Sequence, residues 1–128
     1  MRPVAIVVED EPDLLQVLTL ALGGALPGVE VRVADTIDAA QQVLAEVVAA
    51  NGTVVLVVAD HNIAGDGQTG LALIEQVKKR FPASARFLFT GQASPEVEAQ
   101  ATALGAKVLW KPLRLASLVA EVQGALAR

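Results

Sequence analysis

The sequence predicts an α/β protein with a parallel sheet of five strands and helices on both faces. Short Val-rich runs alternate along the chain with Ala- and Leu-rich segments of helical spacing. The chain has 128 residues, 53% of them hydrophobic, and this length fits a single domain with one real core. A strand–helix unit repeated five times, joined by right-handed crossovers, gives a doubly wound sheet.

Five short apolar runs are the expected strands. The first and third are almost uninterrupted and rich in β-branched residues, which favours strands buried on both faces of a parallel sheet. The second alternates valine with charged residues, so we expect a half-exposed strand nearer an edge. The runs are Val4–Val8, Val29–Ala34, Val54–Ala59, Arg86–Phe89 and Val108–Trp110.

The first two helices have recognisable start and stop signals. Pro12 is tolerated in a first helical turn, and Gly23–Gly24 is expected to end that helix. Either Asp35 or Thr36 can cap the second helix, which should run to Asn51–Gly52.

Similar signals mark the other three helices. Thr69 can cap the third helix, and Pro82 closes it. Ser94 stands before the fourth, which should end at Gly105. The fifth is expected from about Leu115 to Leu126. The predicted order is therefore strand then helix throughout.

Composition excludes several classes of protein. The chain has 14 acidic and 10 basic side chains and no basic stripe, which is unfavourable for nucleic-acid binding. With no cysteine and one histidine, thiolate zinc sites and histidine metal clusters are excluded. The N-terminal apolar stretch is too short for a signal peptide and runs into acidic residues. We therefore expect a soluble, cytoplasmic domain.

Polar residues stand immediately after each of the five predicted strands. In doubly wound folds, ligands bind at the carboxyl ends of the strands, so these residues should converge on one rim. Asp35 follows the second strand, but an edge position places it farther away. The converging residues are Glu9, Asp10 and Glu11, then Asp60, then Thr90 and Gly91, then Lys111.

This rim has the chemistry of a magnesium and phosphoryl site. Two carboxylates about 4 Å apart repel by about 4 kcal/mol at an effective dielectric near 20, and a divalent cation offsets this. An all-oxygen ligand set favours Mg²⁺, with Mn²⁺ as a substitute. Lys111, the Thr90 hydroxyl and the Gly91 amide can contact phosphate oxygens. We expect a phosphoryl group on or beside Asp60.

At these positions the chain resembles the response-regulator receiver domain of two-component signalling. The matching segments are VVEDEPDLL, VVLVVADHN, FLFTG and VLWKP, and the resemblance covers essentially the whole chain. It implies one receiver domain over 1–128, flavodoxin-like, with strand order 2-1-3-4-5. It implies that Asp60 is the phosphoacceptor, that Thr90 and Lys111 are the signalling hydroxyl and the phosphate-binding lysine, and that Glu9, Asp10, Asp60 and the Asn62 carbonyl hold Mg²⁺.

The same resemblance implies partners. A histidine kinase or histidine phosphotransfer protein would donate the phosphoryl group, and a downstream protein would bind the changed surface. The domain would catalyse only its own phosphorylation and slow dephosphorylation, so it is not an enzyme in the usual sense. It would be a monomer or weak dimer without nucleic-acid binding or membrane insertion.

The chain departs from the commonest receiver pattern in three places. Glu9 stands where Asp is more usual, and could act on the ion through water. The loop HNIAGDGQTG is longer than usual and looks like receivers of hybrid histidine kinases. Val108 replaces the usual switching Tyr or Phe, so we expect Trp110 and the segment 91–95 to carry part of the output. The Lys111–Pro112 bond is expected to be cis.

Two other functions remain open at this point. A degenerate receiver would act as a phosphorylation-independent binding module, although the complete acid, hydroxyl and lysine set argues against it. An aspartyl-phosphate phosphatase would need a second acid two residues after Asp60, where Asn62 stands. His61 is expected to be an exposed loop residue and not a general base.

Overall fold

The core of the protein is a sheet of five parallel strands in the order β2-β1-β3-β4-β5. A computed structural model describes residues 2–61 and 69–127 of the chain. The predicted strand order and doubly wound architecture are confirmed. The strands are β1 (Val4–Val8), β2 (Glu30–Ala34), β3 (Val54–Ala59), β4 (Ala85–Thr90) and β5 (Lys107–Trp110).

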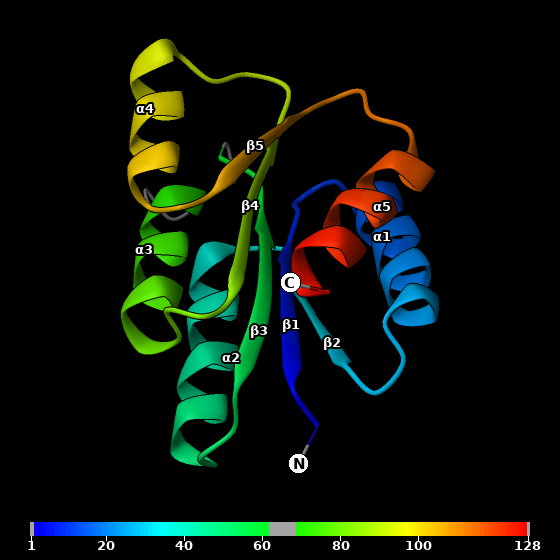
Figure 1. Cartoon of the computed structure of the whole chain (residues 1–128), viewed down its shortest axis with the longest axis vertical. Coiled ribbons are helices and arrows are strands. Elements are labelled where there is room, and N and C mark those ends of the chain that lie inside the picture. The colour runs from blue at the N-terminus through cyan, green and yellow to red at the C-terminus, as the bar shows by residue number, and fades with distance from the viewer. Residues whose placement is uncertain (1, 62–68, 128) are drawn as a thin grey trace.

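Five helices cover the sheet in two layers. Helices α1 and α5 lie on one face, and α2, α3 and α4 lie on the other (Figure 1). The helices are α1 (Pro12–Ala25), α2 (Ile37–Ala49), α3 (Gly70–Arg80), α4 (Pro95–Ala103) and α5 (Leu115–Leu126). None of the helices in the described ranges is long and apolar enough to span a membrane.

The two faces of the sheet form separate hydrophobic cores. Along β1, Val4, Ile6 and Val8 pack with α2 and α3, whereas Ala5 and Val7 pack with α1 and α5. This alternation is the period of two of a strand, and all five residues of β1 are buried. Central strands can therefore be apolar at every position, as the sequence pattern indicated.

The helix caps agree only in part with the predictions. The second helix is capped by Thr36 and not by Asp35, since the Thr36 hydroxyl accepts a hydrogen bond from the Ala39 amide. The Ser94 hydroxyl caps α4 by accepting from the Val97 amide. Thr69 precedes α3 but makes no side-chain cap bond.

The predicted end of the first helix was wrong. Helix α1 continues past Gly23–Gly24 to Ala25, because the next residue, Leu26, is buried and its amide donates to the Leu22 carbonyl. Core packing thus offsets the cost of two glycines in a helix. The other differences are small: β2 starts at Glu30, β4 extends to Ala85 and Thr90, and β5 starts at Lys107.

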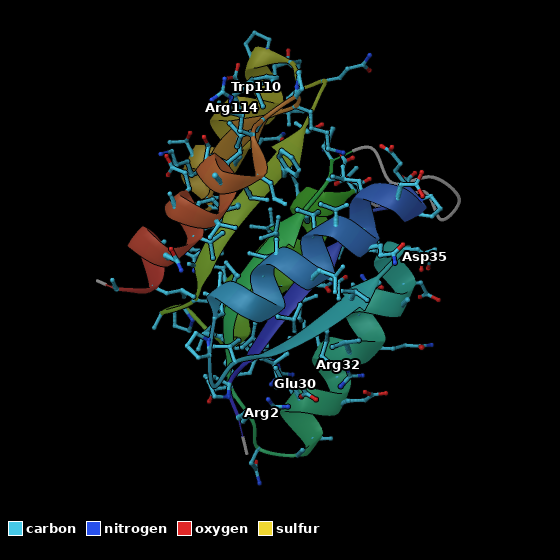
Figure 2. All side chains as sticks on the ribbon, turned by 90° about the vertical axis from the view of Figure 1, so that its right-hand side faces the viewer. Arg2, Glu30, Arg32, Asp35, Trp110 and Arg114 are labelled. Atoms are coloured by element: carbon cyan, nitrogen blue, oxygen red, sulfur yellow. The ribbon has the colours of Figure 1, made fainter. Side chains whose placement is uncertain are left out.

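The position of a strand in the sheet determines how close its last residues lie to the centre of the carboxyl rim. Strand β2 forms one edge of the sheet and β5 the other. Figure 2 shows Asp35 at the end of β2, far from Trp110 at the end of β5. The prediction that Asp35 stands apart agrees with this edge placement.

Candidate functional site

The backbone places three of the predicted residues by extending the strand ladders one residue further. The Glu9 amide donates to the Ala34 carbonyl of β2 at 3.1 Å, and the Asp60 amide donates to the Val8 carbonyl of β1 at 3.2 Å. In the same way, the Lys111 amide donates to the Thr90 carbonyl of β4 at 2.9 Å. Each residue is thus fixed by the last carbonyl of a neighbouring strand.

Lys111 connects the far edge of the sheet to its centre. Its ammonium donates to Oδ2 of Asp60 at 2.8 Å and to Oε1 of Glu9. The ammonium also lies 5.2 Å from the centre of the Phe89 ring, a cation–π contact. The Lys111–Pro112 bond is cis, as predicted. Residues from β1, β3 and β5 therefore meet in one ion-paired group.

Burial and hydrogen bonds have opposite effects on the pKa values of Glu9 and Lys111. Burial raises the pKa of Glu9 above its ordinary value, and the hydrogen bonds from Lys111 and the Glu11 amide offset this only in part. For Lys111, burial lowers the pKa, but the hydrogen bonds to Asp60 and Glu9 outweigh it, so the pKa is raised. The lysine is therefore held in its charged form beside two carboxylates.

Three carboxylates form a cluster that fits a hard cation. One oxygen from each of Glu9, Asp10 and Asp60 lies within 4.8 Å of the others. Glu9 and Asp60 are buried, whereas Asp10 is exposed. Both oxygens of Glu9 already accept hydrogen bonds, from Lys111 and from the Glu11 amide at 3.2 Å, which favours contact with an ion through water. Asn62 lies outside the described residues.

Thr90 ends β4 with a fully buried side chain. Its hydroxyl donates to the Gln92 carbonyl at 3.1 Å and accepts from the Gln92 amide at 3.3 Å. The hydroxyl thus closes a small turn at the start of the β4–α4 connection. Gly91 is exposed, and a Cβ there would meet only the Lys111 side chain at an ordinary 3.7 Å. Binding by its amide stays a prediction.

Comparison with known proteins identifies the family. Residues 5–123 match the family model described as the response regulator receiver domain. The chain belongs to this receiver family. No curated protein matches the chain closely enough to be counted as a relative.

Solved receivers share the fold. A CheY-like receiver from Methanospirillum hungatei JF-1 has 23% identity and a TM-score of 0.81, over 99% of this chain and 95% of that one. The BeF3-activated DrrB receiver domain has 20% identity and a TM-score of 0.78, with both chains covered completely. NtrX from Brucella abortus, solved with ADP, has 26% identity and a TM-score of 0.78, over 99% of this chain and 27% of that one.

Two aromatic side chains, His61 and Trp110, lie beside the receiver site and line the same hollow. His61 is half-buried, not exposed as predicted, and its Nδ1 has no hydrogen-bond partner among the described residues. Trp110 is 42% exposed and lines two hollows beside α4, one with Gln92 and Ser94 and the other with Val108. Trp110 pairs in register with Thr90 across β4 and β5.

Sequence reasoning missed two residues of the receiver site, Gly70 and Phe89. Gly70, the first residue of α3, lies directly against the backbone of Asp60. A signal was present, since a glycine directly at a helix start is a residue that allows close approach of another backbone. The apolar pattern after Thr69 was interpreted only as a helix start. Phe89, assigned only to a strand, adds the ring below Lys111.

Proposed function

We propose that this receiver accepts a phosphoryl group on Asp60 and changes its binding surface in response. The observation that carries this is the Asp60 side chain, only 10% exposed yet placed at the strand end and paired with Lys111. A carboxylate oxygen of Asp60 attacks phosphorus in line, and the P–N bond of a donor phosphohistidine breaks. The electron pair of that bond stays on the imidazole nitrogen, which then takes up a proton.

The surrounding residues have separate roles in this transfer. Asp10, Asp60 and, through water, Glu9 would hold Mg²⁺, which supplies charge neutralisation at the phosphoryl oxygens. Lys111 is already charged and adjacent, so it can pair with a phosphoryl oxygen without a change of protonation. The Thr90 hydroxyl would exchange its Gln92 contact for the phosphoryl group, and the β4–α4 connection would move with it.

A hollow beside Lys111 supports a protein donor. It measures about 400 Å³ and is lined by apolar side chains of α1 and of the segment after β5, with acidic Glu11 and Asp13. Val17 lines it at 44% exposure, and Leu20 on the same helix is 71% exposed. An apolar surface next to the reacting carboxylate suits a histidine-bearing helix of a kinase or phosphotransfer protein. Cytoplasmic location follows from such a partner.

Phosphorylation by a small donor tests the proposal. The chain is incubated with acetyl phosphate and Mg²⁺ and followed by intact mass, and we expect one phosphoryl group per chain. Asp60→Asn should remove it completely. Asp35→Asn is the matched control, because Asp35 also follows a strand but is exposed at the outer edge. Label on Asp60→Asn, or equal loss in both variants, contradicts the assignment.

The same experiment distinguishes the proposed phosphoacceptor from a degenerate receiver. A phosphorylation-independent binding module would take no label from acetyl phosphate and would show no Mg²⁺ binding by calorimetry. The proposed receiver binds Mg²⁺ without a donor present, and Asp10→Asn weakens that binding. Labelling and metal binding together therefore distinguish the two functions.

A further inference from the structure

The backbone of Gly70 lies directly against the backbone of the proposed phosphoacceptor, Asp60. A Cβ built on Gly70 would lie 2.2 Å from the Asp60 carbonyl oxygen, 2.9 Å from the carbonyl carbon and 3.3 Å from the Ala59 Cβ. Real Cβ atoms essentially never approach another heavy atom within 3.0 Å. Hydrogen is therefore the only side chain that this position accepts without movement.

The Asp60 backbone is consequently held from two sides. Its amide donates to the Val8 carbonyl of β1, and its carbonyl faces the first residue of α3. Helix α3 is itself fixed, because Leu73, Ile74 and Val77 are fully buried against the sheet. The side chain is held in addition by Lys111. If a side chain were added at Gly70, neither α3 nor the end of β3 could move away without disrupting these contacts.

We infer that Gly70 is a positioning residue for phosphorylation, which sets the Asp60 carboxylate by letting α3 pack directly on its backbone. This inference rests on the proposed phosphoacceptor function. To restore a separation of 3.0 Å, an added Cβ and the Asp60 carbonyl would have to move apart by about 0.8 Å. Displacements of about 1 Å in a reacting group lower rates up to about a hundredfold.

The described residues on either side of the β3–α3 connection meet at the phosphoacceptor. The chain leaves the site after Asp60 and returns to the same residue at Gly70.

Gly70→Ala tests the inference, with Gly124→Ala as the matched control. Gly124 is helical, on α5, and a Cβ there would meet nothing within 4 Å. We expect Gly70→Ala to slow phosphorylation by acetyl phosphate by about tenfold to a hundredfold and to weaken Mg²⁺ binding in calorimetry. Gly124→Ala should leave both unchanged. Circular dichroism and urea unfolding report whether each variant is folded.

A second variant separates positioning from general destabilisation. Val77→Ala removes buried methyl groups from α3 far from Asp60 and should lower stability without changing the rate per folded molecule. The phosphorylation rates of Gly70→Ala and Val77→Ala are compared with their free energies of unfolding. If both rates fall only as far as the loss of stability explains, Gly70 has an ordinary packing role and the inference is wrong. A folded Gly70→Ala chain with the wild-type rate and Mg²⁺ affinity contradicts it as well. An unfolded Gly70→Ala chain also contradicts it, because the clash would then be relieved by loss of the fold.

Failure of the proposed function would look different. Wild-type chain that takes no phosphoryl group contradicts the phosphoacceptor role, whatever Gly70→Ala does. The Mg²⁺ titration still tests the placement of Asp60 in that case. Equal Mg²⁺ affinity in wild type and folded Gly70→Ala would overturn the positioning role alone.

Discussion

The two ends of the sheet differ in how their charged side chains are paired. At the carboxyl end, the carboxylates of Glu9, Asp10 and Asp60 gather within ligand distance of one another, and Lys111 pairs with two of them. Within this group the negative charge exceeds the positive, and Glu9 and Asp60 are buried. Such an arrangement costs free energy unless a cation offsets it.

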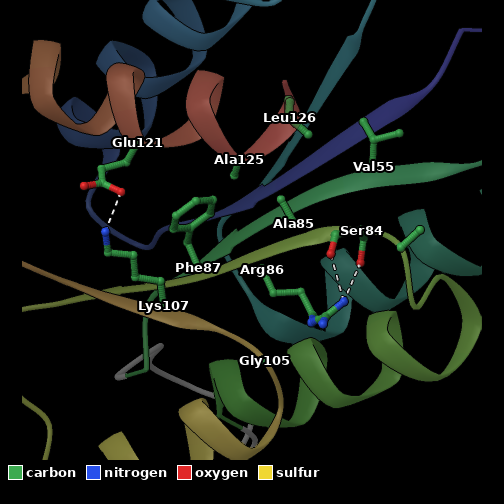
Figure 3. Close-up of a pocket in the computed structure, with 11 residues that line it drawn as sticks. Val55, Ser84, Ala85, Arg86, Phe87, Gly105, Lys107, Glu121, Ala125 and Leu126 are labelled. Carbon is green, nitrogen blue, oxygen red and sulfur yellow. Dashed lines mark hydrogen bonds and ion pairs between the residues drawn. The ribbon is translucent and has the colours of Figure 1, made fainter. Parts of the chain in front are cut away.

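At the amino end, the charged groups are satisfied by the fold itself (Figure 3). Arg86 donates to the carbonyls of Leu104, Pro82 and Ser84 at 2.8–3.1 Å. Lys107 pairs with Glu121 at 2.6 Å, with both side chains well exposed. A hollow of about 470 Å³ lies between them, with Phe87, Val55 and Leu126 in its lining.

The difference shows that a hollow and a site need not coincide. Hollows of similar size are present at both ends, about 470 Å³ at the amino end and about 400 Å³ beside Lys111. At the amino end, Arg86 and Lys107 have acceptors in nearby carbonyls and in Glu121. At the carboxyl end, three carboxylates gather around one lysine. The balance of charge therefore distinguishes the two ends better than volume does.

The largest expected effect comes from Lys111, which directly follows β5, compared with Lys107, which begins it. Lys111→Ala should slow phosphorylation by about a hundredfold or more, because removal of one preorganised positive donor has effects of that size. Lys107→Ala, at the opposite end of β5, should leave the rate unchanged and alter stability by less than about 1 kcal/mol. Initial rates with acetyl phosphate measure both. Similar rates for the two variants would remove the functional distinction between the ends.

Arg86→Ala should show the reverse pattern. Three carbonyls would lose a charged donor, so we expect a loss of about 1–3 kcal/mol in the free energy of unfolding. Urea unfolding measures this loss. The phosphorylation rate of the folded variant should equal that of the wild type. A slower rate with unchanged stability would mean that the amino end takes part in the chemistry.

A smaller effect is expected from removing one charge of the acidic cluster. Without metal, Asp60→Asn should raise the free energy of unfolding by about 1 kcal/mol, since it relieves repulsion with Glu9 and Asp10. Mg²⁺ at a hundredfold excess over its dissociation constant should stabilise the wild type by about 2.7 kcal/mol and the variant by less. Urea unfolding with and without Mg²⁺ gives all four values. Destabilisation of metal-free Asp60→Asn would show that the Lys111 pairing outweighs the repulsion.

The smallest effect is spectroscopic and depends on Trp110. Because this single tryptophan pairs in register with Thr90 and is partly exposed beside α4, its fluorescence should change when beryllofluoride and Mg²⁺ mimic the phosphoryl group. Thr90→Ala and Asp60→Asn should abolish the change. An unchanged signal with ligand binding confirmed by calorimetry would mean that Trp110 is packing alone and that the output lies elsewhere.

Much of this receiver followed from local pattern. Continuous apolar runs such as Val54–Ala59 predicted buried parallel strands, because only a strand covered on both faces is apolar at every position. Residues directly after those strands had to meet, since parallel strands share a carboxyl end. Asp60 and Lys111 could therefore be placed in one site from the sequence, and their distance of 2.8 Å agrees with that.

Other features of the protein depend on contacts between segments that are distant in the sequence, and only the tertiary structure shows them. The end of α1 moved past Gly23–Gly24 because Leu26 is buried in the core, and His61 became half-buried because helices α3 and α4 border it. The burial that raises the pKa of Glu9 and the approach of Gly70 to the Asp60 carbonyl have the same origin. Local periodicity specifies which face of an element is apolar. It does not specify which atoms of another element come to lie against that face, and those atoms set the burial and the position of the reacting group.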